Sequence, residues 1–317
     1  MNRRSAIDCL RRGFLSTRAN LGLLPLKALQ DLLVTLLIVA SLVPPILVLG
    51  GQALLEGGWS EAALESWLAG LGDEVASRMV PVALASVASL VIGLLAVMVW
   101  GWFEGGLLGI LVAAERQARP GAEDHAGGWR WFRTFSLRDF SGWGGRHVWR
   151  FFWFFHLTMT AALVLVVIGL LLALAAVYGG ESWGAGAAFG IGCGGALPLA
   201  FAFLVFALWF SAAQPAVALE GSGAVRGSAL GLRVVGRRLG AALLLLLVMM
   251  VVATVLGIAL AVGQGMAGLL IEDSLGAWVA LYLSFFLVQV ALGAALNVFI
   301  LASYSSLVVA EVGGEPQ

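Results

Sequence analysis

Long apolar runs separated by short polar segments dominate the hydrophobic pattern of this chain. Six of these runs reach the about 20 residues that a helix needs to cross a hydrocarbon core of about 30 Å. Backbone polar groups find no water inside a bilayer, so each run is expected to be a helix. The pattern therefore predicts six membrane spans, near residues 26–50, 80–114, 148–178, 187–219, 239–262 and 275–310.

The composition supports the same class. The chain of 317 residues is 61% hydrophobic and 11% charged, with a mean hydropathy of +0.99. Soluble domains carry about 25% charged residues, and a membrane β-barrel would show short segments of alternating polarity. We therefore expect an all-α membrane protein, with residues 1–317 forming a single polytopic domain.

Three of the apolar runs end in the same way, with a small apolar stretch followed by one glutamate. The endings are Ile110–Glu115, Pro215–Glu220 and Ser306–Glu311. Self-similarity at a roughly regular spacing is the signature of a repeated structural unit. It predicts three tandem helical hairpins, covering residues of about 5–115, 127–220 and 223–311.

Each predicted hairpin follows a basic segment, at residues 5–24, 127–150 and 223–240. In the middle segment arginines alternate with large aromatic residues, which is typical of a helix lying in the lipid headgroup plane. We expect basic amphipathic interfacial segments that contact anionic lipid; the alternative is a cytosolic loop packed on the bundle. The residues expected to contact lipid are Trp129, Arg130, Trp131, Arg133, Trp149, Arg237 and Arg238.

Charge is distributed very unevenly between the two sides of the predicted spans. Of the 18 lysines and arginines, all except Arg78 fall before the first span or in the loops after the second and fourth spans. Short loops rich in Lys and Arg stay in the cytoplasm. Both termini are therefore expected in the cytosol, with the first span retained as an anchor in a bacterial inner membrane. This topology accounts for the arginines, so no nucleic-acid partner is expected.

The inward helices are longer than a membrane requires. A helix from Val80 to Glu115 would measure roughly 50 Å. Gly105, Pro215 and Ser303 precede the glutamates, so we expect a kink near each and the glutamate segment beyond it at the cytosolic surface. The residues expected to act as hinges between repeats are Glu115, Glu220 and Glu311. Each glutamate either pairs with an arginine of a basic segment, faces water or has a functional role.

Few ionisable residues fall inside the spans. Glu104 and Asp31 lie close enough to the inner boundary to reach it with their side chains, which is where we expect their carboxylates. His156 is the only histidine within a span, and the two cysteines, Cys9 and Cys193, have no metal-site spacing. No metal, cofactor or disulfide is therefore predicted.

Span six carries a stripe of polar residues at helical spacing, Tyr282, Gln289, Asn297 and Tyr304. Such a stripe faces protein or a water-filled cavity, so it forms interhelical hydrogen bonds or lines a substrate path. Glycines at every fourth position predict close helix contacts on two other spans. They are Gly101, Gly105 and Gly109 on span two and Gly186, Gly190 and Gly194 on span four.

Residues Pro215–Leu245 combine a proline, an apolar stretch, Glu-Gly, an arginine-rich amphipathic segment and a new apolar run. This order resembles the six-helix membrane domain that accompanies some bacterial glycerophosphodiester phosphodiesterases. The resemblance implies the architecture of that domain. It implies no activity, because the catalytic barrel with its His-Arg-Gly motif is absent from this chain.

No enzyme signature was found: the chain lacks a phosphate-binding loop, a nucleophile elbow and a zinc-protease motif. We therefore predict a non-enzymatic membrane-embedded scaffold or accessory component that contacts anionic lipid or a protein partner at the cytosolic face. The alternative is a transporter of small molecules or lipids, with a cavity lined by Tyr282, Gln289, Asn297 and Tyr304.

Overall fold

A computed structural model of the chain describes residues 4–49, 72, 75–219, 223–269 and 275–312. Its elements are α-helices and two 3-10 helices, η1 and η2. The chain divides into two compact units. One comprises Met1–Ala28 with Gly101–Gln317, and the other comprises Leu29–Trp100.

In the described part of the chain, six helices are long and apolar enough to cross a membrane. They are α2 (Leu23–Leu49), α5 (Met79–Gln117), α6 (Leu137–Trp183), α7 (Ala185–Ala218), α9 (Leu239–Leu269) and α10 (Leu275–Val312). Each overlaps one of the six runs expected from the hydrophobic pattern. The all-helical class and the six candidate spans are therefore confirmed, and they indicate a multi-pass membrane protein.

Two short amphipathic helices precede the candidate spans α2 and α9. Helix α1 (Ala6–Ala19) starts at a capping box, in which Ser5 and Asp8 exchange hydrogen bonds between side chain and backbone. Helix α8 (Ala224–Arg237) follows Gly223, and a single residue, Arg238, separates it from α9. Both fall inside basic segments identified from the sequence.

The middle basic segment is built differently from the other two. A 3-10 helix, η2 (Gly128–Phe132), is followed by Ser136, whose hydroxyl caps α6 by accepting from the Asp139 backbone N–H at 3.0 Å. From Leu137 the chain runs in one helix to Trp183. A separate interfacial helix at 137–150 is therefore not formed, because no strong stop signal separates this stretch from the apolar run.

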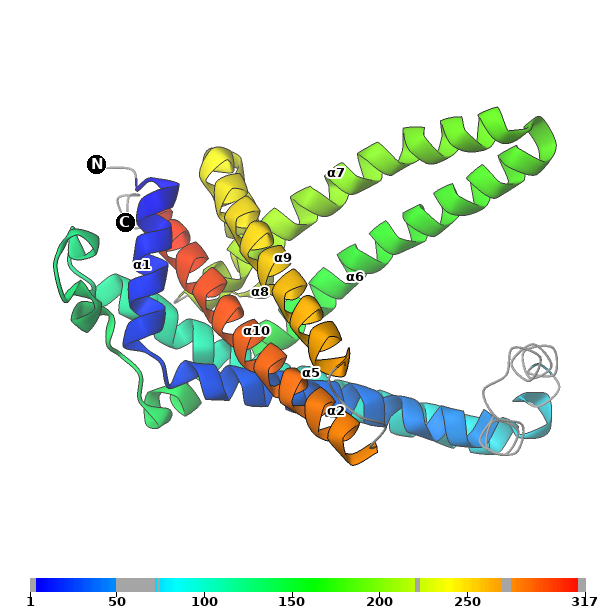
Figure 1. Cartoon of the computed structure of the whole chain (residues 1–317), viewed down its shortest axis with the longest axis horizontal. Helices are drawn as coiled ribbons and strands as arrows, with labels where there is room; N and C mark the ends of the chain where they lie inside the picture. The colour runs from blue at the N-terminus through cyan, green and yellow to red at the C-terminus, as the bar shows by residue number, and fades with distance from the viewer. Residues whose placement is uncertain (1–3, 50–71, 73–74, 220–222, 270–274, 313–317) are drawn as a thin grey trace. The chain divides into compact units, whose positions relative to one another are not determined.

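The long helices of the first unit pair as antiparallel neighbours. Helices α6 and α7 lie side by side along their length (Figure 1), with the backbone of Gly195 against Leu172 and that of Gly180 against Ala188. Gly184 alone joins them, with a φ of 86° that favours glycine. Helices α9 and α10 form a second pair.

The second unit contains the greater parts of α2 and α5. Near one end of the unit, Gln30 Nε2 donates to the Trp100 carbonyl at 3.4 Å. Near the other, Arg78 Nη1 donates to the Val48 carbonyl at 3.0 Å. Contacts at both ends describe a third antiparallel helix pair.

Three of the long helices show no interruption at the expected breakers. Helices α5, α7 and α10 stay helical through residues 105, 213 and 304, so none of them ends at a breaker, and the bend expected there stays a prediction. Ser303 and Ser305 remain helical by returning their hydroxyls to the carbonyls of Phe299 and Leu301. Gly105 remains helical because it packs tightly against another helix.

The last turns of these helices form the buried core of the first unit instead of lying at the surface. The fully or nearly fully buried side chains include Leu107, Leu108 and Leu111 of α5, Ala212, Ala216 and Val217 of α7, and Leu301, Leu307 and Val308 of α10. By contrast, the apolar middle of α6 is exposed, as at Leu163, Leu170 and Leu174. Protein packing is therefore concentrated near one end of the helices. Beyond this packed end, the helices expose apolar surface that is long enough to span a bilayer.

One of the two predicted small-residue faces makes the expected contact. Gly101, Gly105 and Gly109 of α5 lie against the first half of α6, where Cβ atoms would approach Phe151, His147 and Trp143. Gly186, Gly190 and Gly194 of α7 meet nothing within 4 Å in the described part of the chain. Neighbouring positions 192 and 195 face α6 instead, so the predicted face of α7 was wrong in register.

Candidate functional site

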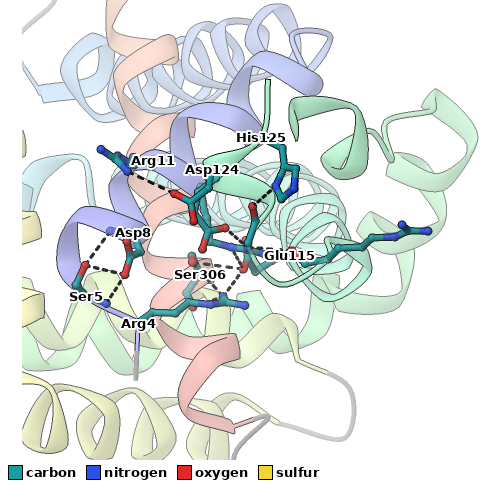
Figure 2. A network of polar contacts seen from close by, with 12 residues as sticks. Arg4, Ser5, Asp8, Arg11, Glu115, Asp124, His125 and Ser306 are labelled. Carbon is teal, nitrogen blue, oxygen red and sulfur yellow. Dashed lines mark hydrogen bonds and ion pairs between the residues drawn. The ribbon is translucent and has the colours of Figure 1, made fainter. Parts of the chain in front are cut away.

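Glu115 lies at the centre of a buried polar network between α1, α5 and α10 (Figure 2). Its Oε1 accepts hydrogen bonds from Arg4 Nη1 and, at 2.7 Å, from Arg12 Nε. The Ser306 hydroxyl of α10 approaches the same oxygen at 3.4 Å and also accepts from Arg4 at 3.2 Å. The carboxylate thus joins three segments that are far apart in the sequence.

Arg12 is the most deeply buried charged residue of this network, with a relative exposure of 0%. Besides Glu115, its guanidinium donates to Glu123 Oε2 at 2.6 Å and to the Arg119 carbonyl at 3.4 Å. It also lies over the Phe132 ring, 4.9 Å from the centroid. Two carboxylates and an aromatic face therefore compensate for the burial of one guanidinium.

The outer side of α1 is far more open to solvent. Arg11 and Asp124 form a long ion pair of 3.8 Å in which both side chains are largely exposed. At the start of the helix, hydrogen bonds from Ser5 lower the pKa of Asp8, because they favour its charged form. Ser5 and Asp8 stabilise the N-terminus of α1, while Arg12 holds the helix in place.

Cys9 lies on the inner face of α1 with a fully buried thiol. Burial raises the pKa of Cys9 to about 11, and a side-chain hydrogen bond with Ser306 offsets part of this effect. The thiol is therefore neutral at physiological pH, and its nucleophilic thiolate form is rare. Cys9 contributes to packing between α1 and α10.

A second arginine–glutamate cluster joins α8 to the end of α10. Glu311 accepts from Arg238 Nε at 3.1 Å and from Arg237 Nη1 at 3.4 Å. Arg238 is mostly buried, and Arg237 is about half exposed. Of the three alternatives for the glutamates, ion pairing with a basic segment is therefore observed for Glu115 and Glu311. Glu220 lies outside the described residues.

Tight backbone packing accompanies both clusters. In α1, Gly13 lies against Ser303 of α10, and in α8, Gly231 lies against Ala213 of α7. Earlier in α8, the Ser228 carbonyl accepts a hydrogen bond from Trp209 Nε1 of α7 at 3.0 Å. Each short helix is thus seated on the buried end of a long helix by a glycine and by polar contacts.

Glu104 and Lys27 form a buried ion pair, with Nζ 3.0 Å from Oε1. Both side chains are almost fully buried. The Glu104 carboxylate is therefore buried beside a cation instead of being exposed to water, and its position relative to the membrane boundary stays a prediction. Asp31 is partly buried and lies in the other unit.

The polar stripe of α10 does not form one lining. Tyr304 is fully buried and donates to the Ala242 carbonyl of α9 at 3.0 Å, whereas Asn297 is partly buried. Gln289 and Tyr282 are exposed, and Tyr282 stacks on Trp278 in a shallow apolar depression. Only Tyr304 is seen to join two helices as the hydrogen-bonding alternative describes.

The residues expected to contact lipid have varied surroundings. Arg130, Arg133 and Trp149 are exposed. Trp129 lies beneath the guanidinium of Arg18, and Trp131 beneath that of Arg119. Arg237 and Arg238 bind Glu311, as described above. These contacts leave only part of the set free to meet a lipid headgroup.

The geometry of the two clusters supports structural ion pairing. Among the residues that the structure describes, no group of three His, Cys, Asp or Glu side chains is placed to hold a metal ion. His147, which belongs to the middle basic segment, is buried in α6 with Nε2 2.9 Å from the Ala218 carbonyl. It connects the start of α6 to the end of α7.

Three features escaped the sequence analysis: the depth of Arg12, the Lys27–Glu104 pair and the contact of His147. A signal for the first was present, because Cys9, Gly13 and Ser16 define a small-residue face of α1 to which Arg12 is adjacent. The Lys27–Glu104 pair and the contact of His147 depend on which helices become neighbours, and the hydrophobic and charge patterns of a single sequence do not reveal that.

Comparison with known proteins adds no assignment: no protein family, no curated protein and no solved structure matches this chain. The resemblance of residues 215–245 to the six-helix membrane domain therefore stays a prediction. Function has to be argued from the packing and charge described above.

Proposed function

We propose that this protein is a non-enzymatic, multi-pass membrane scaffold or accessory component of a bacterial inner membrane. The observation that carries the proposal is that tight packing and apolar exposure occupy different parts of the long helices. Their last turns form a compact core with buried ion pairs, while long apolar surfaces, as on α6, remain uncovered by the chain itself. Uncovered apolar surface of membrane length suits lipid or another membrane protein.

The proposed scaffold consists of three hairpin repeats. Supporting this, α1 and α8 have the same length of 14 residues, and each ends in a residue whose N–H donates to two preceding carbonyls. Each short helix pairs its arginines with the glutamate that ends its own proposed repeat, Glu115 or Glu311. In each case the helix packs on a long helix of another repeat, α10 for α1 and α7 for α8.

The proposed orientation places both termini and the packed core in the cytosol. Its support is the concentration of 17 of the 18 basic residues on one side of the spans, with Arg78 as the exception. Reporter fusions test it: a fluorescent protein that folds only in the cytosol should light up at the C-terminus, and alkaline phosphatase there should be inactive. The opposite pair of results would reverse the orientation.

Recovery from native membranes tests the scaffold role. The tagged full-length protein is extracted with its surrounding lipid by a polymer and analysed by quantitative mass spectrometry, beside an unrelated six-span protein of the same membrane. We expect a defined protein or lipid class enriched over that control. Recovery of the protein with bulk lipid composition and no enriched partner would contradict the proposal.

A further inference from the structure

We propose that the exposed faces of α1 and α8 are paired docking surfaces for the headgroups of acidic phospholipids. The proposal rests on the proposed membrane-embedded role and names the lipid class that the scaffold binds. It also moves the principal lipid contact from the aromatic segment around Trp129 to two helices seated at the entry of membrane spans.

The outward face of α1 combines apolar side chains with arginines. Ile7 and Phe14 of α1 and Leu21, two residues beyond its end, are spaced by seven residues, and each is more than half exposed. Arg11 and Arg18 lie between them on the same side of the helix and are also exposed, with Arg11 in a long, exposed ion pair with Asp124 and Arg18 over the ring of Trp129. A helix face turned to water has no need of large exposed apolar residues such as Ile7 and Phe14.

Helix α8 and the first residue of α9 repeat this arrangement. Val225, Leu232 and Leu239 are again spaced by seven residues, with relative exposures of 74%, 54% and 49%. Arg226 and Arg233 are exposed beside them. No acidic residue occurs between Ala224 and Leu239, so the face carries only positive charge.

Both helices have their opposite face firmly buried, so these outward faces are not spare core surface. Gly13 of α1 and Gly231 of α8 seat the two helices on α10 and α7. Each helix leads within a few residues into a candidate membrane span, starting at Leu23 or Leu239. The outward faces are therefore placed where a chain enters the membrane.

Acidic phospholipid fits this combination better than the other anionic partners. Aliphatic and aromatic side chains bury into the acyl boundary, while arginines remain at headgroup level and bind phosphate. A nucleic acid would leave Phe14 and Leu232 in water. Each arginine near an anionic surface strengthens binding roughly fivefold, so two arginines on one face distinguish acidic from neutral lipid by about 25-fold.

The test titrates the full-length protein in an uncharged detergent with phosphatidylglycerol or phosphatidylcholine, with bound lipid counted by native mass spectrometry. Two double variants, R11Q/R18Q and R226Q/R233Q, each remove two charges from one face. The matched control, R130Q/R133Q, removes two exposed charges from the aromatic segment. All are made with Cys193→Ala, so that maleimide labelling of buried Cys9 reports whether α1 remains docked.

We expect the wild type to prefer phosphatidylglycerol, and each face variant to lose about 25-fold in affinity for one class of bound lipid with Cys9 still protected. The control should bind as the wild type does. Phe14→Ser should weaken binding of both lipids to a similar extent, because it removes apolar contact and leaves the charge unchanged.

Three results would overturn the proposal. They are equal binding of the two lipids, unchanged phosphatidylglycerol affinity in both face variants, and a loss in the control as large as theirs. If lipid affinity is unchanged while a face variant loses an acidic protein recovered from native membranes, the faces bind protein instead. In each case an enriched partner in the wild-type preparation would leave the scaffold role standing.

Discussion

Arg11 and Arg12 are adjacent in α1 and have opposite surroundings. Arg12 is fully buried against Glu115, Glu123 and Phe132, whereas Arg11 makes one exposed ion pair at 3.8 Å. A buried ion pair is expensive to break, because the remaining charge stays in a poorly solvated site. An exposed pair contributes little.

The two arginines therefore provide a matched test. Arg12→Met should lower the free energy of unfolding by about 3–5 kcal/mol, since it leaves Glu115 and Glu123 with less compensation. Arg11→Met should change it by less than about 1 kcal/mol. Unfolding of the purified protein by SDS in mixed micelles measures both. Equal effects of the two substitutions would contradict the buried network.

Cys9 predicts a dependence of stability on alkaline pH. Its folded pKa of about 11 lies above the ordinary value of 9.0, so the folded state retains the thiol proton that the unfolded state loses. Stability from the neutral thiol is complete below pH 9 and falls as the pH rises towards 11, by up to about 3 kcal/mol. The difference between wild type and Cys9→Ala, measured by SDS unfolding from pH 7 to 11, isolates this term. A constant difference would show that the thiol is not buried.

At the residue scale, the sequence patterns predicted that charged residues form ion pairs better than they predicted which two residues pair. Pairing of the terminal glutamates with basic segments was one of three predicted alternatives, and it holds for Glu115 and Glu311. Burial of Glu104 was missed, because Lys27 was counted among the basic residues before the first span and not as a partner of a residue in the second span. A charge pattern gives no distance between Lys27 and Glu104, which are brought together only by helix packing.

Among the elements, α8 depends on close approach to α7. Gly231 is the point of contact, where an added Cβ would lie 2.5 Å from the Ala213 Cα and 2.7 Å from its backbone N. Gly236, one and a half turns later, faces open space in the described part of the chain. The same substitution at the two positions should therefore have opposite signs.

Gly231→Ala should destabilise the protein by about 1–3 kcal/mol, because α8 has to shift away from α7. Gly236→Ala should stabilise it by about 0.5–1 kcal/mol through helix propensity alone. Thermal unfolding in detergent measures the two shifts. A stabilising effect at Gly231 would mean that α8 is not packed on α7 as described.

Element boundaries were predictable where polarity changes sharply and not elsewhere. The six spans, α1 and α8 follow from apolar runs and capping or charge signals. Gly105 and Ser303 do not end their helices, because both pack against neighbouring helices. The separate interfacial helix expected in the middle basic segment does not form for a similar reason. Residues 137–150 pack along α5 as part of α6.

For the molecule as a whole, the central feature is that the first described helix, α1, packs against the last one, α10. Helix α1 packs along α10, and Glu115 of α5 joins both through Arg4, Arg12 and Ser306. Figure 1 shows α1 beside α10. The packed core of the proposed scaffold therefore closes through contacts between its ends, and it should remain intact while the apolar surfaces engage lipid or partners.

Oxidative cross-linking in native membranes tests this closure most directly. Cys9 already lies beside Ser306, so Ser306→Cys in a Cys193→Ala background should form an intramolecular disulfide with copper phenanthroline. Ser305→Cys is the matched control, because the Ser305 hydroxyl is turned to its own helix at the Leu301 carbonyl. The account predicts a Cys9-linked peptide from Ser306→Cys and little or none from Ser305→Cys. No cross-link from Ser306→Cys, or equal cross-linking from both, would contradict the packing of α1 on α10.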